Sequence, residues 1–202
     1  TGNPKKITDK QEPARVARSV ASMKLKYVVL TSVNRDDLDD GGAAHFSETI
    51  KQVKRFSKNI TVEALVPDFN GSEKSVDTIL DSGVDVFAQN LETVKRLTPE
   101  VRDNRAGYFQ SLKVLSYVKK SSPKTITKTS LMLGLGESEE EIKKTLGDIK
   151  SSGVDVLTLG QYLRPTLNHL PVKKWVEPSK FKEYKNFAKD IGIKEVSSGP
   201  LV

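Results

Sequence analysis

The chain has 202 residues, no cysteine and a formal net charge of +7 at pH 7. Without cysteine it holds no disulfide scaffold, no thiol nucleophile and no thiolate metal site of its own. No apolar run approaches the roughly 18 residues of a membrane helix, and with aromatic residues at only 6% the lysines predict solvated helix faces rather than a nucleic-acid surface.

Six β-rich runs recur along the chain. In chain order they lie within residues 22–30, 60–66, 81–88, 125–133, 151–158 and 190–197. The third and fifth contain the same five letters, Ser-Gly-Val-Asp-Val. Gly83, Gly153 and Gly192 stand where a left-handed residue would end the preceding helix, and the apolar, β-branched residues after them are typical of buried parallel strands.

Helical patterns fill the gaps between these runs. Each has apolar residues three or four positions apart, the spacing of one helix face. The stripes are Phe46-Ile50-Val53, Val76-Ile79-Leu80, Leu112-Leu115-Val118, Ile142-Leu146-Ile149 and Phe181-Tyr184-Phe187. Ser138-Glu-Glu-Glu141 forms a capping box that opens the fourth helix, and Pro178 precedes the last.

The alternation of strands and helices predicts an α/β fold of repeated (β/α) units, with a strand about every 33 residues. A partial TIM-like barrel suits them better than a doubly wound sheet, because no Gly-x-Gly-x-x-Gly follows an early strand. No linker or low-complexity stretch interrupts the sequence, so we predict one domain over residues 1–202. The chain has no initial Met and no targeting segment, so we expect an internal piece of a longer protein.

Polar residues follow the first and third predicted strands, at the ends where such folds place their sites. Thr31 and Ser32 lead into an acidic run, residues 36–40, in which the spacing of an EF-hand calcium loop fails and the acids fit helix caps as well. Asn90 and Glu92 lie two apart beyond a strand, so both can face one cavity. A carboxylate beside an amide suits a sugar diol, although a helix cap would use the same residues.

The fourth predicted strand contains a lysine. By strand alternation Lys128, Ser130 and Met132 share one face. A lysine within a strand is costly unless it faces a functional cavity, where it could bind a carboxylate or form a Schiff base. Arg164, after the next strand, offers a second cation for an anion. The two histidines lack ligand spacing, so we predict no metal site.

Residues 27–43, Tyr-Val-Val-Leu-Thr-Ser-Val-Asn-Arg-Asp-Asp-Leu-Asp-Asp-Gly-Gly-Ala, closely resemble the lipoyl synthases, a family of radical S-adenosylmethionine (SAM) enzymes. The resemblance continues through Asn90-Leu-Glu-Thr-Val94, Val101-Arg-Asp-Asn-Arg105, Gln110-Ser-Leu112 and residues 127–137, 157–166, 169–171 and 198–200. It covers nearly the whole chain in family order, so the sequence is identified as a member of that family.

The resemblance implies a reaction, its cofactors and its partners. The reaction is the insertion of two sulfur atoms into an octanoyl chain on a lipoyl carrier domain, such as the glycine cleavage H protein or a 2-oxoacid dehydrogenase E2 subunit. In the family a [4Fe-4S] cluster on a cysteine loop cleaves SAM reductively, and a second cluster supplies sulfur. The family occurs in several compartments, and we expect the mitochondrial matrix, with the bacterial cytoplasm as the alternative.

The resemblance also implies which residues contact SAM. Thr31 and Ser32 would approach its amino group, Asn90 and Glu92 its ribose, and Lys128 its carboxylate with Ser130 beside it; residues 132–134 would run along the adenine and Arg164 would border the cavity. The resemblance leaves the catalytic residues unknown.

The sequence departs from the family pattern in three places. Residues 1–4 would directly follow the cysteine loop, and Val202 precedes the segment whose serine ligates the second cluster. We therefore expect that this piece lacks both cluster sites and the first barrel strand, and that alone it is inactive. The third departure is Gln89, where the family pattern leads us to expect histidine.

Two other functions remain open on the residues alone. A Schiff-base aldolase would also place a lysine in a barrel strand, at Lys128. A non-catalytic protein could use the basic surplus to bind acidic lipoyl carrier domains.

Overall fold

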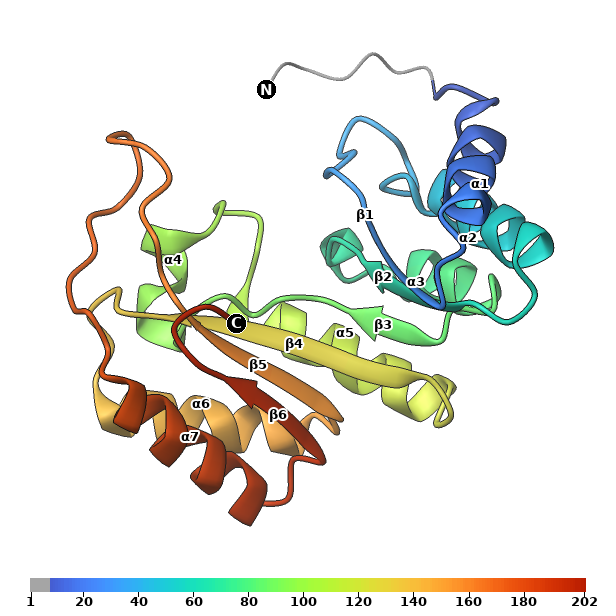
Figure 1. The fold of residues 1–202 in the computed structure, drawn as a ribbon. Coiled ribbons are helices and arrows are strands. Elements are labelled where there is room, and N and C mark those ends of the chain that lie inside the picture. Colours follow the sequence, from blue (N-terminus) through green and yellow to red (C-terminus); the bar gives the residue numbers. More distant parts are fainter. Residues whose placement is uncertain (1–7) are drawn as a thin grey trace.

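The computed structural model describes residues 8–202, in which six parallel strands form one curved sheet (Figure 1). In spatial order they are β1 (Tyr27–Thr31), β2 (Thr61–Leu65), β3 (Val86–Ala88), β4 (Ile126–Leu133), β5 (Val156–Gln161) and β6 (Glu195–Ser198). Within the described residues β1 and β6 do not pair, so the sheet stays open. The predicted α/β fold, a partial barrel of (β/α) repeats, is confirmed. Residues 1–4, predicted to follow a cysteine loop, lie outside the described residues.

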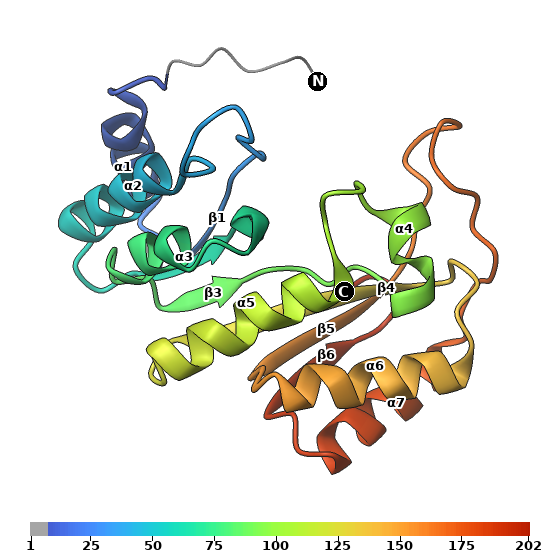
Figure 2. The same cartoon turned by 180° about the vertical axis from the view of Figure 1, so that it is seen from behind.

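The helices cover the convex face of the sheet, as the view from behind shows (Figure 2). They are α1 (Glu12–Ser22), α2 (Ala43–Phe56), α3 (Glu73–Leu80), α5 (Tyr108–Ser121), α6 (Glu139–Ser151) and α7 (Pro178–Asp190), with the short α4 (Thr98–Val101) and two 3₁₀ turns, η1 (Phe69–Gly71) and η2 (Lys95–Leu97). The five striped segments are all helical. The sequence pattern does not predict α1. Its buried residues are Pro13, Ala17 and Val20, and these are too small to form a clear apolar stripe.

Local signals act at the helix ends as predicted. The Ser138 hydroxyl accepts a hydrogen bond from the Glu141 amide, and the Glu141 carboxylate accepts one from the Ser138 amide, so the capping box opens α6. Gly83, Gly153 and Gly192 all have positive φ just after a helix, a conformation that other residues adopt only at a cost.

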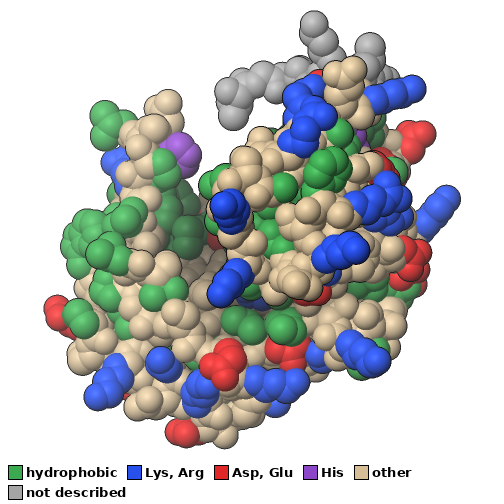
Figure 3. Space-filling model, turned by 45° about the vertical axis from the view of Figure 1, so that its right-hand side comes forward, with side chains coloured by type: hydrophobic (Ala, Val, Ile, Leu, Met, Phe, Trp, Pro, Cys, Tyr) green, Lys and Arg blue, Asp and Glu red, His purple; other side chains and the backbone are tan. Residues whose placement is uncertain are grey.

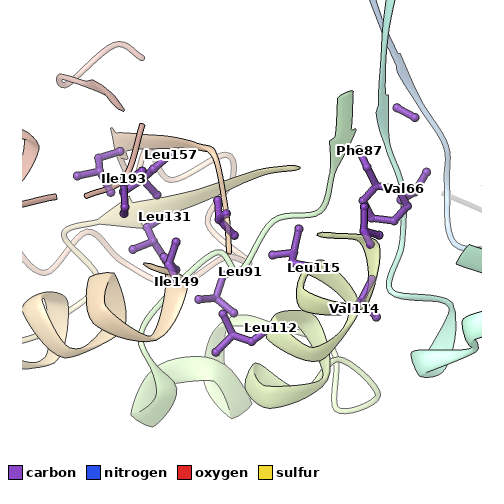
Figure 4. Close-up of a cluster of buried hydrophobic side chains, with 14 of the residues drawn as sticks. Val66, Phe87, Leu91, Leu112, Val114, Leu115, Leu131, Ile149, Leu157 and Ile193 are labelled. Carbon is purple, nitrogen blue, oxygen red and sulfur yellow. The ribbon is translucent and has the colours of Figure 1, made fainter. Parts of the chain in front are cut away.

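The core lies between the sheet and its helices (Figure 4). Leu115, Ile149 and Leu157 are fully buried there, on α5, α6 and β5. On β4 the residues alternate, so that Leu131 points into this core while Lys128 points to the concave face. The predicted shared face of Lys128, Ser130 and Met132 is therefore confirmed.

The concave face is only partly covered. Tyr27 and Val29 of the edge strand β1 are 47% and 49% exposed, as expected where a barrel is incomplete. Among residues 8–202, none of the helices combines the length and apolar character that a membrane span requires.

The repeated Ser-Gly-Val-Asp-Val motif forms the same structure twice, at the start of β3 and of β5. In the first copy the Asp85 amide donates to the Val62 carbonyl (3.1 Å), and the Asp85 carboxylate accepts from the Val62 amide (2.8 Å). In the second, Asp155 makes the same two bonds with Thr127 (both 3.0 Å). Each aspartate thus closes the backbone ladder with the strand beside it.

A lysine from a helix completes each aspartate. Lys54, near the end of α2, lies 2.9 Å from the Asp85 carboxylate, and Lys119, near the end of α5, lies 2.6 Å from that of Asp155. Lys194 adds a second cation at 2.6 Å from Asp155. These lysines and the backbone bond hold the pKa of Asp155 at about 2 although burial alone would raise it. The charged form of Asp155 therefore stabilises the fold.

Replacing Asp155 with Asn should lower the free energy of unfolding at pH 7 by about 2–3 kcal/mol, because each unit of pKa depression is worth about 1.4 kcal/mol. The folded-state pKa lies below the ordinary 3.8, so this stabilisation is present at neutral pH and disappears as the pH falls toward 2. Urea denaturation of both proteins across that range measures the difference.

Asp85→Asn is the matched control. Its carboxylate is 38% exposed and has one lysine partner instead of two, so the same change should cost less there. An Asp155→Asn protein that matches the wild type at pH 7 would show that the second motif does not depend on charge.

Candidate functional site

A hollow of about 200 Å³ lies at the carboxyl ends of β1, β2 and β3. The residues that line it include Thr31, Ser32, Asn90, Glu92 and Arg102. The space-filling view shows a groove between two projecting parts of the molecule (Figure 3). Four of the seven predicted site residues therefore come together, because the carboxyl ends of parallel strands meet at one edge.

The chain leaves the sheet after β3 and rejoins it four residues later, and this detour turns Asn90 and Glu92 into the hollow. The buried hydroxyl of Thr129 on β4 bridges the gap, since it donates to the Gln89 carbonyl (2.9 Å) and accepts from the Leu91 amide (3.1 Å). Glu92 then rejoins β4, with its amide on the Ser130 carbonyl and its carbonyl on the Met132 amide.

Glu92 is held in an unusual state. Its φ is +70°, a left-handed conformation that few residues other than glycine adopt. Burial raises the pKa of its carboxyl group, against the opposing effects of a hydrogen bond from Asn90 and the charge of Arg102. Backbone strain and a poorly solvated carboxylate in one residue are typical of a ligand-binding position.

Arg102 is a site residue that the sequence analysis did not select. It follows α4, its guanidinium donates to the Ser111 hydroxyl of α5 (2.8 Å), and it lines the hollow beside Glu92. Its only sequence signal is its place in Val101-Arg-Asp-Asn-Arg105, a loop where two arginines stand close together and nothing distinguishes them.

Lys128 does not line the hollow. Its ammonium lies 2.8 Å from the Glu63 carboxylate of β2, which is almost fully buried and also accepts a hydrogen bond from the Tyr27 hydroxyl. The lysine reaches β2 across β3, where its neighbour in the sheet is the small Ala88. Ser130 lies further along the same face of β4 and outside the hollow.

Arg164 is exposed and used within its own segment. Its guanidinium donates to the His169 carbonyl (2.8 Å) and to the Leu167 carbonyl, and so braces the bend of the projecting segment 162–177. The predicted second cation therefore does not lie in the hollow.

The acidic run and the two histidines have structural partners. Asp40 caps α2 through the amides of Gly42 and Ala44, and Asp36 pairs with Arg105. His45 lies 2.8 Å from Glu12, and His169 contacts Thr166. Within the described part of the chain no group of three or more histidines or acids could hold a metal ion.

Comparison with known proteins shows extensive similarity. A sequence profile described as the radical SAM superfamily matches residues 1–149. The chain is 57% identical to the lipoyl synthase of Thermus thermophilus and 59% identical to that of Legionella pneumophila strain Corby, in each case over all 202 residues. It spans 62% and 61% of those proteins, about three fifths of their length. The resemblance to lipoyl synthases predicted from the motifs is confirmed.

Solved structures of low identity share the fold. Methylornithine synthase gives a TM-score of 0.67 at 12% identity over 93% of this chain and 61% of its own. Streptococcus suis SuiB bound to S-adenosylmethionine gives 0.64 at 12% identity, over 88% of this chain and 39% of its own.

Glu92→Gln should make the protein more stable at pH 7, because the amide removes a carboxylate that burial keeps from being well solvated. The folded-state pKa of Glu92 is raised, so the wild type regains stability as the pH falls toward the ordinary value of 4.5, and the advantage of the variant should shrink. Urea denaturation at neutral and acid pH tests this. Equal stability at pH 7 would contradict a carboxylate at Glu92 that opposes folding.

Proposed function

The chain belongs to the radical SAM superfamily, and from that premise we propose that it is the SAM-binding part of a lipoyl synthase. The proposal for the whole protein is the insertion of two sulfur atoms into a protein-bound octanoyl chain. Its partners would be lipoyl carrier domains such as the H protein and the E2 subunits. The relatives named above are bacterial, which favours the bacterial cytoplasm, and the mitochondrial matrix stays a prediction.

The proposal depends on one observation, which is the position of Asn90 and Glu92 in the detour after β3. The detour after β3 presents an amide and a buried carboxylate side by side in one hollow. The carboxylate accepts hydrogen bonds from the two hydroxyls of a ribose, and the amide both donates and accepts. A strained backbone that holds this pair in place fits the recognition of one diol in one orientation.

The other lining residues suit the amino-acid end of SAM. The hydroxyls of Thr31 and Ser32 can accept from an ammonium group, and the Arg102 guanidinium can pair with a carboxylate. These residues bind and orient the ligand, and the wall of the hollow limits its contact with water.

Lys128, Ser130 and Arg164 stay predicted contacts. Lys128 would have to leave the Glu63 carboxylate before it could bind another, and a buried Glu63 left alone would be costly. Arg164 would have to give up the two carbonyls of its own segment. The proposal therefore depends on the four residues that share the hollow and on Arg102.

The iron–sulfur clusters do not fit the residues of this chain. Such clusters are held by cysteine thiolates, and the chain has none. The roles proposed for the residues of this chain therefore include no cluster chemistry. The chemistry of the clusters belongs to the proposal for the longer protein, while the residues here bind and orient the nucleoside.

Neither alternative function gains support from the geometry. A Schiff base needs a free amine, and the ammonium of Lys128 is held 2.8 Å from a carboxylate. Lysines are spread over the surface and partly paired with acids of their own, as on α7 where Lys180 contacts Glu139. A surface of this kind does not favour a carrier-binding protein without catalysis.

The wild-type chain should bind S-adenosylhomocysteine, the stable analogue of SAM. Asn90→Ala should weaken binding about 2- to 10-fold, because a hydrogen bond between neutral groups such as an amide and a sugar hydroxyl is worth about 0.5–1.5 kcal/mol. Isothermal titration calorimetry measures both affinities. Asn168→Ala, which removes an exposed amide from the projecting segment, is the matched control and should bind as the wild type does.

An Asn90→Ala protein with the affinity of the wild type would place the nucleoside elsewhere. A wild-type chain that binds no S-adenosylhomocysteine at millimolar concentration would remove the proposal for this chain.

A further inference from the structure

Three polar side chains from three segments form a row that begins at the wall of the hollow, where Gln89 and Arg102 both line it, and ends at Ser111 behind that wall. Arg102 donates from Nη1 to the Ser111 Oγ (2.8 Å), and Gln89 lies with its Nε2 3.0 Å from the same oxygen. Ser111 is fully buried on α5, and Gln89 is 2% exposed at the end of β3. This row joins the cation of the hollow to the interior of the protein.

The hydrogen bonds of this row are incomplete. The Oε1 of Gln89 is buried and has no partner. A buried polar atom without a partner costs stability and is uncommon in native proteins. Burying the polar side chains of Gln89 and Ser111 costs stability, and packing alone explains that poorly.

The local chain does not fix the side chain of Arg102, so its guanidinium needs a partner elsewhere. It follows the last residue of α4 with extended backbone, and the next three residues are exposed. A free arginine side chain loses about 2 kcal/mol of rotamer entropy when it is fixed. The bond to Ser111 fixes the guanidinium before a ligand arrives, and such preorganisation raises affinity without a new contact.

We propose that Gln89 and Ser111 are positioning residues that hold the Arg102 guanidinium at the wall of the hollow, where it meets the anionic end of the ligand. Ser111 does not line the hollow, so it acts only through Arg102, whereas Gln89 also lines the hollow. The identity of that ligand rests on the proposed function, whereas the anchoring of Arg102 does not.

Glu92 reports on Arg102 when no ligand is bound. The charge of Arg102 lowers the pKa of the Glu92 carboxyl group, against the burial that raises it. Asn90 also lowers it, and among residues 8–202 the only other acid that lines the hollow is Asp68. If Arg102 loses its anchor and moves into solvent, the pKa of Glu92 rises, while Asn90 and Asp68 are unchanged.

The first measurement is therefore the pKa of Glu92 in the ligand-free chain. Carbon-13 NMR of its carboxyl group records the titration. Ser111→Ala and Gln89→Leu should raise this pKa in the same direction as Arg102→Gln, which sets the largest effect. Gln89→His places a ring nitrogen near Ser111 and should leave the pKa of Glu92 near the wild-type value. Ser116→Ala, on the same helix, is the control for removal of a hydroxyl.

The second measurement compares two nucleosides by calorimetry. S-adenosylhomocysteine carries the amino-acid carboxylate, and 5′-methylthioadenosine lacks it. Ser111→Ala should bind the first about tenfold more weakly and the second within twofold of the wild type. A general loosening of the hollow would weaken both, and that result would overturn the positioning role.

The two measurements separate the inference from the proposed function. A wild type that binds neither nucleoside contradicts the proposed function, and the Glu92 titration still decides the inference. A Glu92 pKa that Ser111→Ala leaves unchanged, while Arg102→Gln raises it, would overturn the inference. If Gln89→Leu fails to fold by circular dichroism, Ser111→Ala and Gln89→His decide it.

Discussion

The hydrogen bonds and ion pairs of Asp85 and Asp155 fix how neighbouring strands align at their amino ends, and the rest of the sheet depends on that alignment. Each aspartate closes the first hydrogen bonds of a strand pair and ties that pair to the end of a helix. Because parallel strands have evenly spaced bonds, a register fixed at the amino ends carries to the carboxyl ends. Thr31, Asn90 and Arg102 meet in one hollow at those carboxyl ends, although 71 residues separate the first from the last.

The site itself exists because one strand stops early. β3 is three residues long beside the eight of β4, so β4 has unpaired backbone groups where β3 is missing. Glu92 pairs with two of them, the Ser130 carbonyl and the Met132 amide, when it returns to the ladder. The Thr129 side chain pairs with the backbone of the detour itself, at the Gln89 carbonyl and the Leu91 amide, and so holds Asn90 and Glu92 toward the hollow.

Periodicity predicted most of the fold because its signals are local. The helix stripes, the glycines after the helices and the capping box at Ser138 each act within a few residues. The α1 helix was missed because Ala17 and Val20 are too small for a clear stripe. The site was predicted where it lies at strand ends, as at Asn90, and missed at Arg102, where the chain has no regular pattern. The partner of Lys128 could not be predicted, since Glu63 is 65 residues away and two strands across the sheet.

Groups that oppose folding and groups that favour it lie at opposite ends of this sheet. Glu92 has a strained φ and a buried carboxylate, and Gln89 has an unsatisfied amide atom, so the residues around the hollow make unfolding easier. At the other end of the strands Asp155 has every partner it needs and a pKa of about 2, so its charge works in the opposite direction. Strand β4 connects these two ends, because the Thr127 amide donates to the Asp155 carboxylate and the Ser130 carbonyl accepts from the Glu92 amide. The unfavourable groups at the hollow therefore lie on a strand whose first residues are fixed by a charged and fully paired aspartate.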